Sequence, residues 1–203
     1  MGKRTLFKPF SIRDLYDVIE ERYLKNISMN KKNFIIIIAI IALAAASRLM
    51  KHPPNFTPIS AIALFGGWYF TKKYFLLIPL AAMFISDIFI GFYDWRLTAI
   101  VYLGVTLTFF AGWLLKKNPN WRRMVAGSLI GSITFFVITN FAVWAMYPYY
   151  PHTWAGLANC FSMGLPFFKN SLAGDLLYGG VLFGAYEFAR YFVLQKQVKE
   201  IGV

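Results

Sequence analysis

The sequence predicts an all-α integral membrane protein with six transmembrane helices. Of its 203 residues, 58% are hydrophobic and only 15% are charged, whereas an ordinary soluble domain carries about 25% charged residues. The hydrophobic residues gather in stretches that approach the ~20 residues needed to cross the hydrocarbon core of a bilayer. This composition excludes a disordered or collagen-like chain, and the single cysteine, Cys160, excludes an internal disulfide.

The first 32 residues form a polar, basic segment. Its first ten residues lack the apolar core and the cleavage site of a signal peptide. Ser11 and Asp14 have the spacing of a helix-capping box. Apolar residues then recur at helical spacing, at Ile12, Leu15, Ile19 and Tyr23. We expect a short amphipathic helix on the cytoplasmic side, which either rests on anionic headgroups or docks a partner.

Six candidate spans follow within a transmembrane domain over 33–195. By hydropathy and helix breakers they cover 33–50, 58–71, 74–92, 97–115, 124–147 and 171–194. The second span is the shortest, so a re-entrant hairpin is the alternative there. Residues 196–203 are expected to form a cytoplasmic tail.

Positive charge decides between these two topologies. With six spans and a cytoplasmic start, only four of the 21 Lys and Arg residues lie outside: Arg48, Lys51, Arg96 and Lys169. A re-entrant second segment would move six more outside: Lys72, Lys73, Lys116, Lys117, Arg122 and Arg123. Because cytoplasmic loops carry the excess of Lys and Arg, we expect six spans with both ends in the cytoplasm. This topology explains the net charge of +12 better than nucleic-acid binding does.

Ionisable side chains at membrane depth are costly and therefore indicate function. In the expected topology Arg48, Asp87 and Asp175 share one depth near the outer side, and Arg48 can pair with either carboxylate. Glu187 lies next to Arg190 near the inner end of the last span and is expected to be interfacial.

A second set of side chains falls at the same outer level. Asn140, Trp144 and Tyr147 follow helical spacing and share one face. Asn55 and Thr57 come from the proline-rich connection 53–58, and Phe167 and Asn170 lead into Asp175. The outer connection from Pro148 to Lys169 is expected to be an irregular aromatic lid. We predict an outward-facing substrate-binding pocket, with interhelical packing as the alternative role for these residues.

Small residues predict close helix packing. Ala42 and Ala46 on the first span, and Ala61, Gly66 and Gly67 on the second, form faces that permit close backbone approach. Internal packing is one interpretation. The other is that Ala42 and Ala46 form a docking face for another membrane protein.

Several of these motifs together identify a resemblance. They are Pro53 to Ile59, Ala61 to Gly67, Ser86-Asp87, Asn140, Leu165 to Phe168, Asn170 and Gly174-Asp175. With them the chain resembles, over about residues 45–190, a family of uncharacterised bacterial integral membrane proteins, domain of unknown function 6580. That resemblance implies a multi-pass protein of the bacterial inner membrane and supplies no activity.

The chain is also similar, more loosely, to the substrate-binding (S) subunits of energy-coupling-factor (ECF) vitamin transporters. The similarity implies a six-helix bundle that takes up a vitamin- or cofactor-like molecule from outside, with or without a separate energising ATPase module. Cobalamin-like ligands occur in that group, and His52, His152 and Cys160 lie on the expected outer side, where they could approach a metal. A lone His or Cys is more often structural, so we predict no metal site and no cofactor.

Two other classes of function compete with transport. Asp94 after Tyr93 and Asp175 after Gly174 loosely resemble the motifs of aspartyl intramembrane proteases, but the first glycine of the Gly-x-Gly-Asp motif is absent. A structural or accessory subunit without a ligand is the third class. The sequence holds no His-Glu-x-x-His and no Walker motif, so we do not expect an enzyme, and any energy must come from a partner or a gradient.

Overall fold

The computed structural model describes residues 31–70, 73–92, 94–116 and 120–201. Within these residues the chain is all-α, with six α-helices, one short 3-10 helix and no strand. The helices are α2 (Lys31–Leu49), α3 (Ile59–Tyr69), α4 (Leu77–Ile90), α5 (Trp95–Leu115), α6 (Trp121–Met146) and α7 (Trp154–Ile201), and η1 (Lys73–Leu76) leads into α4. The amphipathic helix expected before residue 31 lies outside the described residues.

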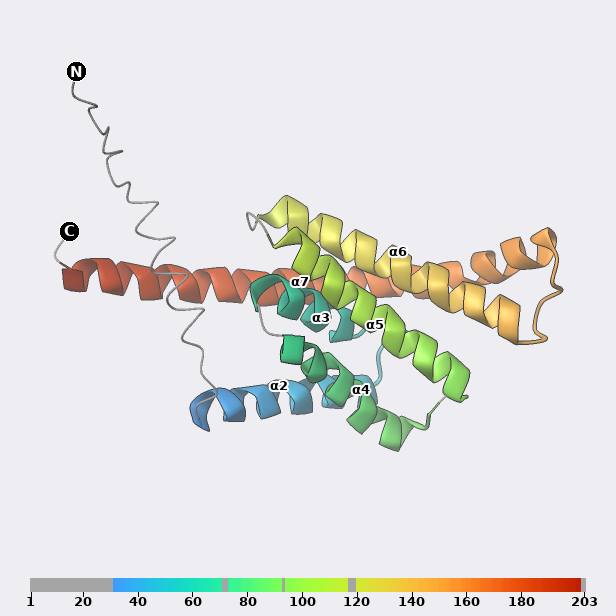
Figure 1. Ribbon diagram of the computed structural model, residues 1–203, viewed down its shortest axis with the longest axis horizontal. Coiled ribbons are helices and arrows are strands. Elements are labelled where there is room, and N and C mark those ends of the chain that lie inside the picture. Colours follow the sequence, from blue (N-terminus) through green and yellow to red (C-terminus); the bar gives the residue numbers. More distant parts are fainter. Residues whose placement is uncertain (1–30, 71–72, 93, 117–119, 202–203) are drawn as a thin grey trace, which may run out of the picture.

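The six helices run alternately in opposite directions, so that α2 begins and α7 ends at the same end of the molecule (Figure 1). Each expected span overlaps one helix, although the last, 171–194, covers only part of α7. Two helices, α5 and α6, are long and apolar enough to cross a membrane. Shorter apolar helices cover Ile37–Leu49, Ile59–Tyr69 and Leu77–Ile90.

The expected irregular lid from Pro148 to Lys169 is wrong, because α7 begins at Trp154 and continues through Pro166. The hydroxyl oxygen of Thr153 starts the helix by accepting a hydrogen bond from the backbone N–H of Gly156 at 3.1 Å. Pro normally breaks a helix because it lacks an N–H and its ring clashes with the preceding turn. Here the helix is held on both sides of Pro166, since the ring of Phe136 on α6 packs against Phe161 and Phe168. Helix α7 also continues past residue 195, where the cytoplasmic tail was expected to begin.

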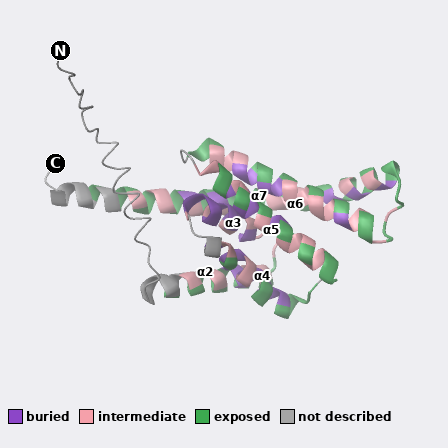
Figure 2. Cartoon of the chain, viewed as in Figure 1, coloured by how far each residue is buried: buried purple, intermediate pink, exposed green. Residues whose placement is uncertain are grey.

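Helix α3 lies at the centre of the bundle and packs mainly on α5 and α7. Figure 2 shows buried residues gathered where these helices meet. Two glycines allow the contact between α3 and α5: a Cβ at Gly67 would lie 1.9 Å from the carbonyl oxygen of Phe109, and one at Gly112 would lie 2.2 Å from that of Leu64. The small-residue face predicted around Gly67 therefore serves internal packing.

Helix α2 packs on α4 through a different pair of alanines. Ala44 and Ala45 are buried, and Ala44 joins the cluster that contains Ala82 and Met83 of α4. Ala42 and Ala46 are exposed on α2. Internal packing does not account for these two positions.

Candidate functional site

A tight turn between α2 and α3 carries the first polar groups of the site. Within this connection Phe56 N–H donates to Pro53 O at 3.0 Å, and Thr57 N–H donates to Asn55 O at 3.1 Å. Asn55 has φ of 63°, a left-handed conformation that Asn adopts more readily than most residues. Gly174 of α7 lies against this turn, because a Cβ there would be 3.4 Å from Phe56 Cα. The turn is thereby fixed against the middle of α7.

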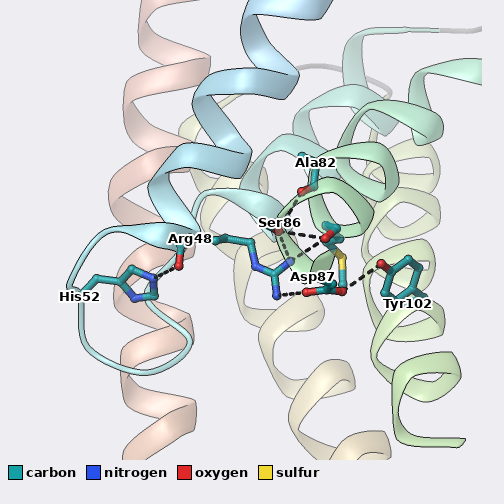
Figure 3. Close-up of polar contacts among 7 residues, drawn as sticks. Arg48, His52, Ala82, Ser86, Asp87 and Tyr102 are labelled. Atoms are coloured by element: carbon teal, nitrogen blue, oxygen red, sulfur yellow. Dashed lines mark hydrogen bonds and ion pairs between the residues drawn. The ribbon is translucent and has the colours of Figure 1, made fainter. Parts of the chain in front are cut away.

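Arg48, at the end of α2, forms a buried ion pair with Asp87 of α4, as Figure 3 shows. Its Nη2 lies 2.8 Å from Asp87 Oδ1. Its Nη1 donates to Ser86 Oγ at 2.5 Å and to Met83 O at 3.1 Å. Tyr102 of α5 donates its hydroxyl to Asp87 Oδ2 at 2.9 Å. Both oxygens of Asp87 therefore have partners, and the pair links α2, α4 and α5.

Asp175 lies in a different environment on α7. It is 4% exposed, and its Oδ2 accepts a hydrogen bond from Ser132 of α6 at 2.6 Å. Among the described side chains, no Lys, Arg or His nitrogen lies within ion-pair distance of Asp175. Arg48 therefore forms its ion pair with Asp87 and not with Asp175.

A cavity of about 550 Å³ lies beside these groups, and all six helices contribute to its wall. Its polar lining comprises Arg48, His52, Asn55, Thr57, Ser60, Ser132, Thr139, Asn140, Ser171 and Asp175. Its apolar lining includes Ile59, Met83, Ile90, Leu97, Val101, Val105, Phe135, Val143 and Phe167. Several lining residues lie close to the α4–α5 and α6–α7 connections: Ile90 is the last residue of α4, Leu97 lies in the first turn of α5, and Asn140 and Val143 lie in the last two turns of α6.

The structure brings together most of the predicted pocket residues. Arg48, Asn55, Thr57, Asn140, Phe167 and Asp175 all line the cavity. Asp87 lies behind Arg48 as its partner. Asn170 is half-buried on α7 and is not part of the lining.

Trp144 and Tyr147 do not line this cavity. Of the three residues predicted to share one face of α6, Asn140 alone reaches it. The indole N–H of Trp144 donates to Pro151 O at 2.9 Å. The hydroxyl of Tyr147 donates to Asp94 Oδ2. Both side chains stabilise the connections at the end of the bundle. Helical spacing predicts that side chains point in a shared direction, but it does not predict which neighbour each side chain contacts.

Sequence reasoning missed Ser132, which holds Asp175, and Ser86 and Tyr102, which hold Arg48 and Asp87. A signal for Ser132 was present. Gly127 and Gly131, with Ser128 and Ser132, repeat small residues at i and i+4 on α6, and all four are buried. Ser86 stood out only as part of the Ser86-Asp87 motif, and Tyr102 carried no signal, because a Tyr in an apolar helix does not reveal which charged side chain it will contact.

The residues considered for metal binding have other partners. His152 packs edge-on against Trp144, and Cys160 donates its thiol to Asn140 O at 3.4 Å. His52 lines the cavity, with Nδ1 2.8 Å from Pro53 O. No group of three or more His, Cys, Asp or Glu side chains with metal-binding geometry occurs in the described residues.

The two aspartates considered for an intramembrane protease also have separate partners. Asp94 is exposed in the α4–α5 connection and contacts Tyr147. Asp175 is buried against Ser132. A catalytic aspartate dyad shares a proton between two adjacent carboxyl groups, and these contacts give no such arrangement.

In the described residues, fold and site together define an all-α protein whose six helices surround a cavity. Beside the cavity lie the Arg48–Asp87 ion pair and Asp175, a buried carboxylate without a cationic partner among these residues. A model described as a family of unknown function (DUF6580) matches residues 28–198, and the chain belongs to this family. This confirms the first of the two resemblances. No curated protein and no solved structure matches the chain, and the similarity to ECF substrate-binding subunits stays a prediction.

Proposed function

We propose that the chain is a multi-pass protein of the bacterial inner membrane that binds a small, vitamin- or cofactor-like molecule in the cavity and transports it. The observation that carries this proposal is the cavity of about 550 Å³, walled by all six helices. Small-molecule sites are typically clefts of about 300–1,000 Å³ with apolar walls and a few convergent polar groups. This cavity has both properties.

The exposure of the apolar helices supports a membrane environment. In the most apolar 18-residue windows of α5 and α6, only 28% and 17% of the residues are buried. A core helix of a soluble protein would instead bury most of such a window. Large apolar side chains such as Leu103, Leu114 and Ile130 are exposed on these helices. Exposed apolar surfaces of this kind are favourable in contact with lipid hydrocarbon and unfavourable in contact with water.

The distribution of basic residues supports the proposed orientation. Lys116, Arg122 and Arg123 flank the α5–α6 connection. This connection lies at the opposite end of the bundle from the α4–α5 and α6–α7 connections (Figure 1), close to which Ile90, Leu97 and Val143 of the cavity lining lie. Under the positive-inside rule, we propose that this end of the cavity faces the outside. Because the chain has no phosphate-binding motif of its own, we include an energising partner module or an ion gradient in the proposal, with the exposed Ala42 and Ala46 as a candidate docking face.

Small molecules that co-purify with the protein in mild detergent test this function. Mass spectrometry should find a molecule that the parent protein retains and that Ser171→Phe loses, because residue 171 lines the cavity. Ala173→Phe is the matched control, since residue 173 is exposed on the same helix, and it should retain the molecule. Equal small-molecule content in all three proteins would favour an accessory subunit without a ligand.

A further inference from the structure

The charges around the cavity do not cancel. Among the described residues Arg48 is the one Lys or Arg in its lining, and it is already paired with Asp87 at 2.8 Å. Asp175 contributes a second carboxylate with no cationic partner among the described residues. If both carboxylates are ionised, the polar wall carries one net negative charge. A charge buried in this way needs a counter-charge or a proton.

Asp175 lines the cavity and keeps one carboxylate oxygen without a partner among the described residues. Ser132 occupies Oδ2, and no described group donates a hydrogen bond to Oδ1. Oδ1 is also absent from the described polar atoms that are both sealed from solvent and unpartnered. Since Asp175 lines the cavity, the space beside Oδ1 is cavity space. A ligand atom placed there would meet an acceptor with no competing donor.

Several hydrogen-bond donors on the wall are committed to the protein itself. Arg48 donates to Met83, Ser86 and Asp87. The hydroxyl of Thr139 donates to Phe135 O at 2.7 Å, and the Asn140 amide donates to Phe136 O at 2.8 Å. Ser132 donates to Asp175. The hydroxyls of Thr57, Ser60 and Ser171 also line the cavity and can each donate or accept, whereas the free oxygen of Asp175 can only accept while the carboxyl group is ionised. A ligand that meets Asp175 must therefore bring a donor of its own.

Building on the proposed function, we propose that the ligand presents a protonated nitrogen to Asp175. An ammonium or amidinium group supplies both the positive charge that Arg48 does not provide and N–H donors for the free oxygen of Asp175. The ligand also carries an apolar part, because Phe135, Phe167 and aliphatic side chains of α5 line the same cavity. An anionic ligand would meet Asp175 with like charge. Asp175 is in this view a specificity-determining residue.

Matched pairs of compounds test this inference on the purified protein. Benzylamine, phenethylamine and tryptamine are compared near neutral pH with benzyl alcohol, phenethyl alcohol and tryptophol, by thermal shift and by equilibrium binding in detergent. In the parent protein the amines should bind at least about tenfold more tightly than the matching alcohols. This comparison needs no variant, so it does not depend on the folding of a mutant.

Variants then test whether Asp175 causes the preference for amines over alcohols. Asp175→Asn should reduce amine affinity at least about tenfold and leave the alcohols almost unchanged, because it removes the charge and keeps the shape. Asp94→Asn is the matched control, since Asp94 is an exposed carboxylate away from the lining, and it should leave the preference intact. Ser132→Ala should also retain the preference, because the carboxylate remains.

Three outcomes would overturn the inference: alcohols that bind as well as amines in the parent, a preference that survives Asp175→Asn, or no binding by any amine. None of these decides the proposed function. That function is judged separately by the molecule that the parent retains and Ser171→Phe loses, whatever its charge.

Discussion

Asp87 and Asp175 are both carboxylates buried within the helices, and their surroundings give them different roles. Asp87 is 2% exposed and is held by Arg48 and Tyr102. Asp175 has one neutral donor and a free oxygen on the cavity side. Asp87 therefore stabilises the structure of the site, whereas Asp175 is available to a ligand.

The Arg48–Asp87 pair yields a prediction about stability. Arg48→Met leaves Asp87 buried without its cation, and removing one partner of a buried pair costs about 3–5 kcal/mol. Denaturant or thermal unfolding in detergent should show a loss of this order. The double variant Arg48→Met with Asp87→Leu restores charge balance and should be more stable than Arg48→Met alone. A double variant no better than the single one would mean that the charge imbalance is not the cause.

The Tyr147–Asp94 contact yields a prediction about pH. The hydrogen bond to Asp94 raises the pKa of the Tyr147 phenol above its ordinary value of 10. Since a folded-state pKa is raised, the contact is fully present below about pH 10 and is lost as pH rises through the raised value. The contribution of Tyr147 to the tyrosinate absorbance is the part that is lost in Tyr147→Phe. This part should therefore titrate above pH 10. Asp94→Asn should move it back toward 10, and an unmoved midpoint would exclude Asp94 as the cause.

Sequence alone could predict the charged residues of the site better than their partners. An Arg or Asp in an apolar helix is conspicuous, so Arg48, Asp87 and Asp175 could all be identified. The choice of Asp87 over Asp175 as the partner of Arg48 depends on how α2 packs against α4, which no residue pattern contains. The roles given to Trp144 and Tyr147 were wrong for the cavity because their neighbours come from the connections at the end of the bundle.

Among the elements, α3 and α5 make the closest backbone contact described here. Gly112→Ala would place a Cβ 2.2 Å from Leu64 O, and because a backbone atom cannot rotate away, the helices must separate. We expect a loss of about 1–3 kcal/mol in the free energy of unfolding. Gly180→Ala is the control, because nothing lies within 4 Å of its added Cβ. It should be neutral or stabilising by up to about 1 kcal/mol; equal losses in both variants would point to a cause other than the α3–α5 contact.

Helix positions follow well from apolar runs, and helix ends follow less well. All six expected spans correspond to helices, because each run is bounded by charged or turn-forming residues. The start of α7 could not be predicted, since Pro and Gly between 148 and 169 resemble a loop in sequence. Only the packing of Phe136 against rings on both sides of Pro166 explains the continuous helix.

At the scale of the whole molecule, the proposed topology predicts which connections face the outside of the cell. Tyr149 and Trp121 have almost the same exposure, 71% and 69%, at opposite ends of the bundle. In a Cys160→Ala background, Tyr149→Cys should react with an impermeant thiol reagent in intact cells, and Trp121→Cys should react only after permeabilisation. The reverse order of labelling would overturn the orientation.

The central place of α3 also constrains how the chain can assemble during synthesis. At 1.5 Å per residue its 11 residues extend only about 17 Å, and its surface is covered mainly by helices that are made later. Phe109 and Gly112 are added more than forty residues after Gly67, and Phe183, which packs on Trp68, is added more than a hundred residues after α3. A nascent chain therefore carries α3 uncovered until α5 and α7 have been synthesised.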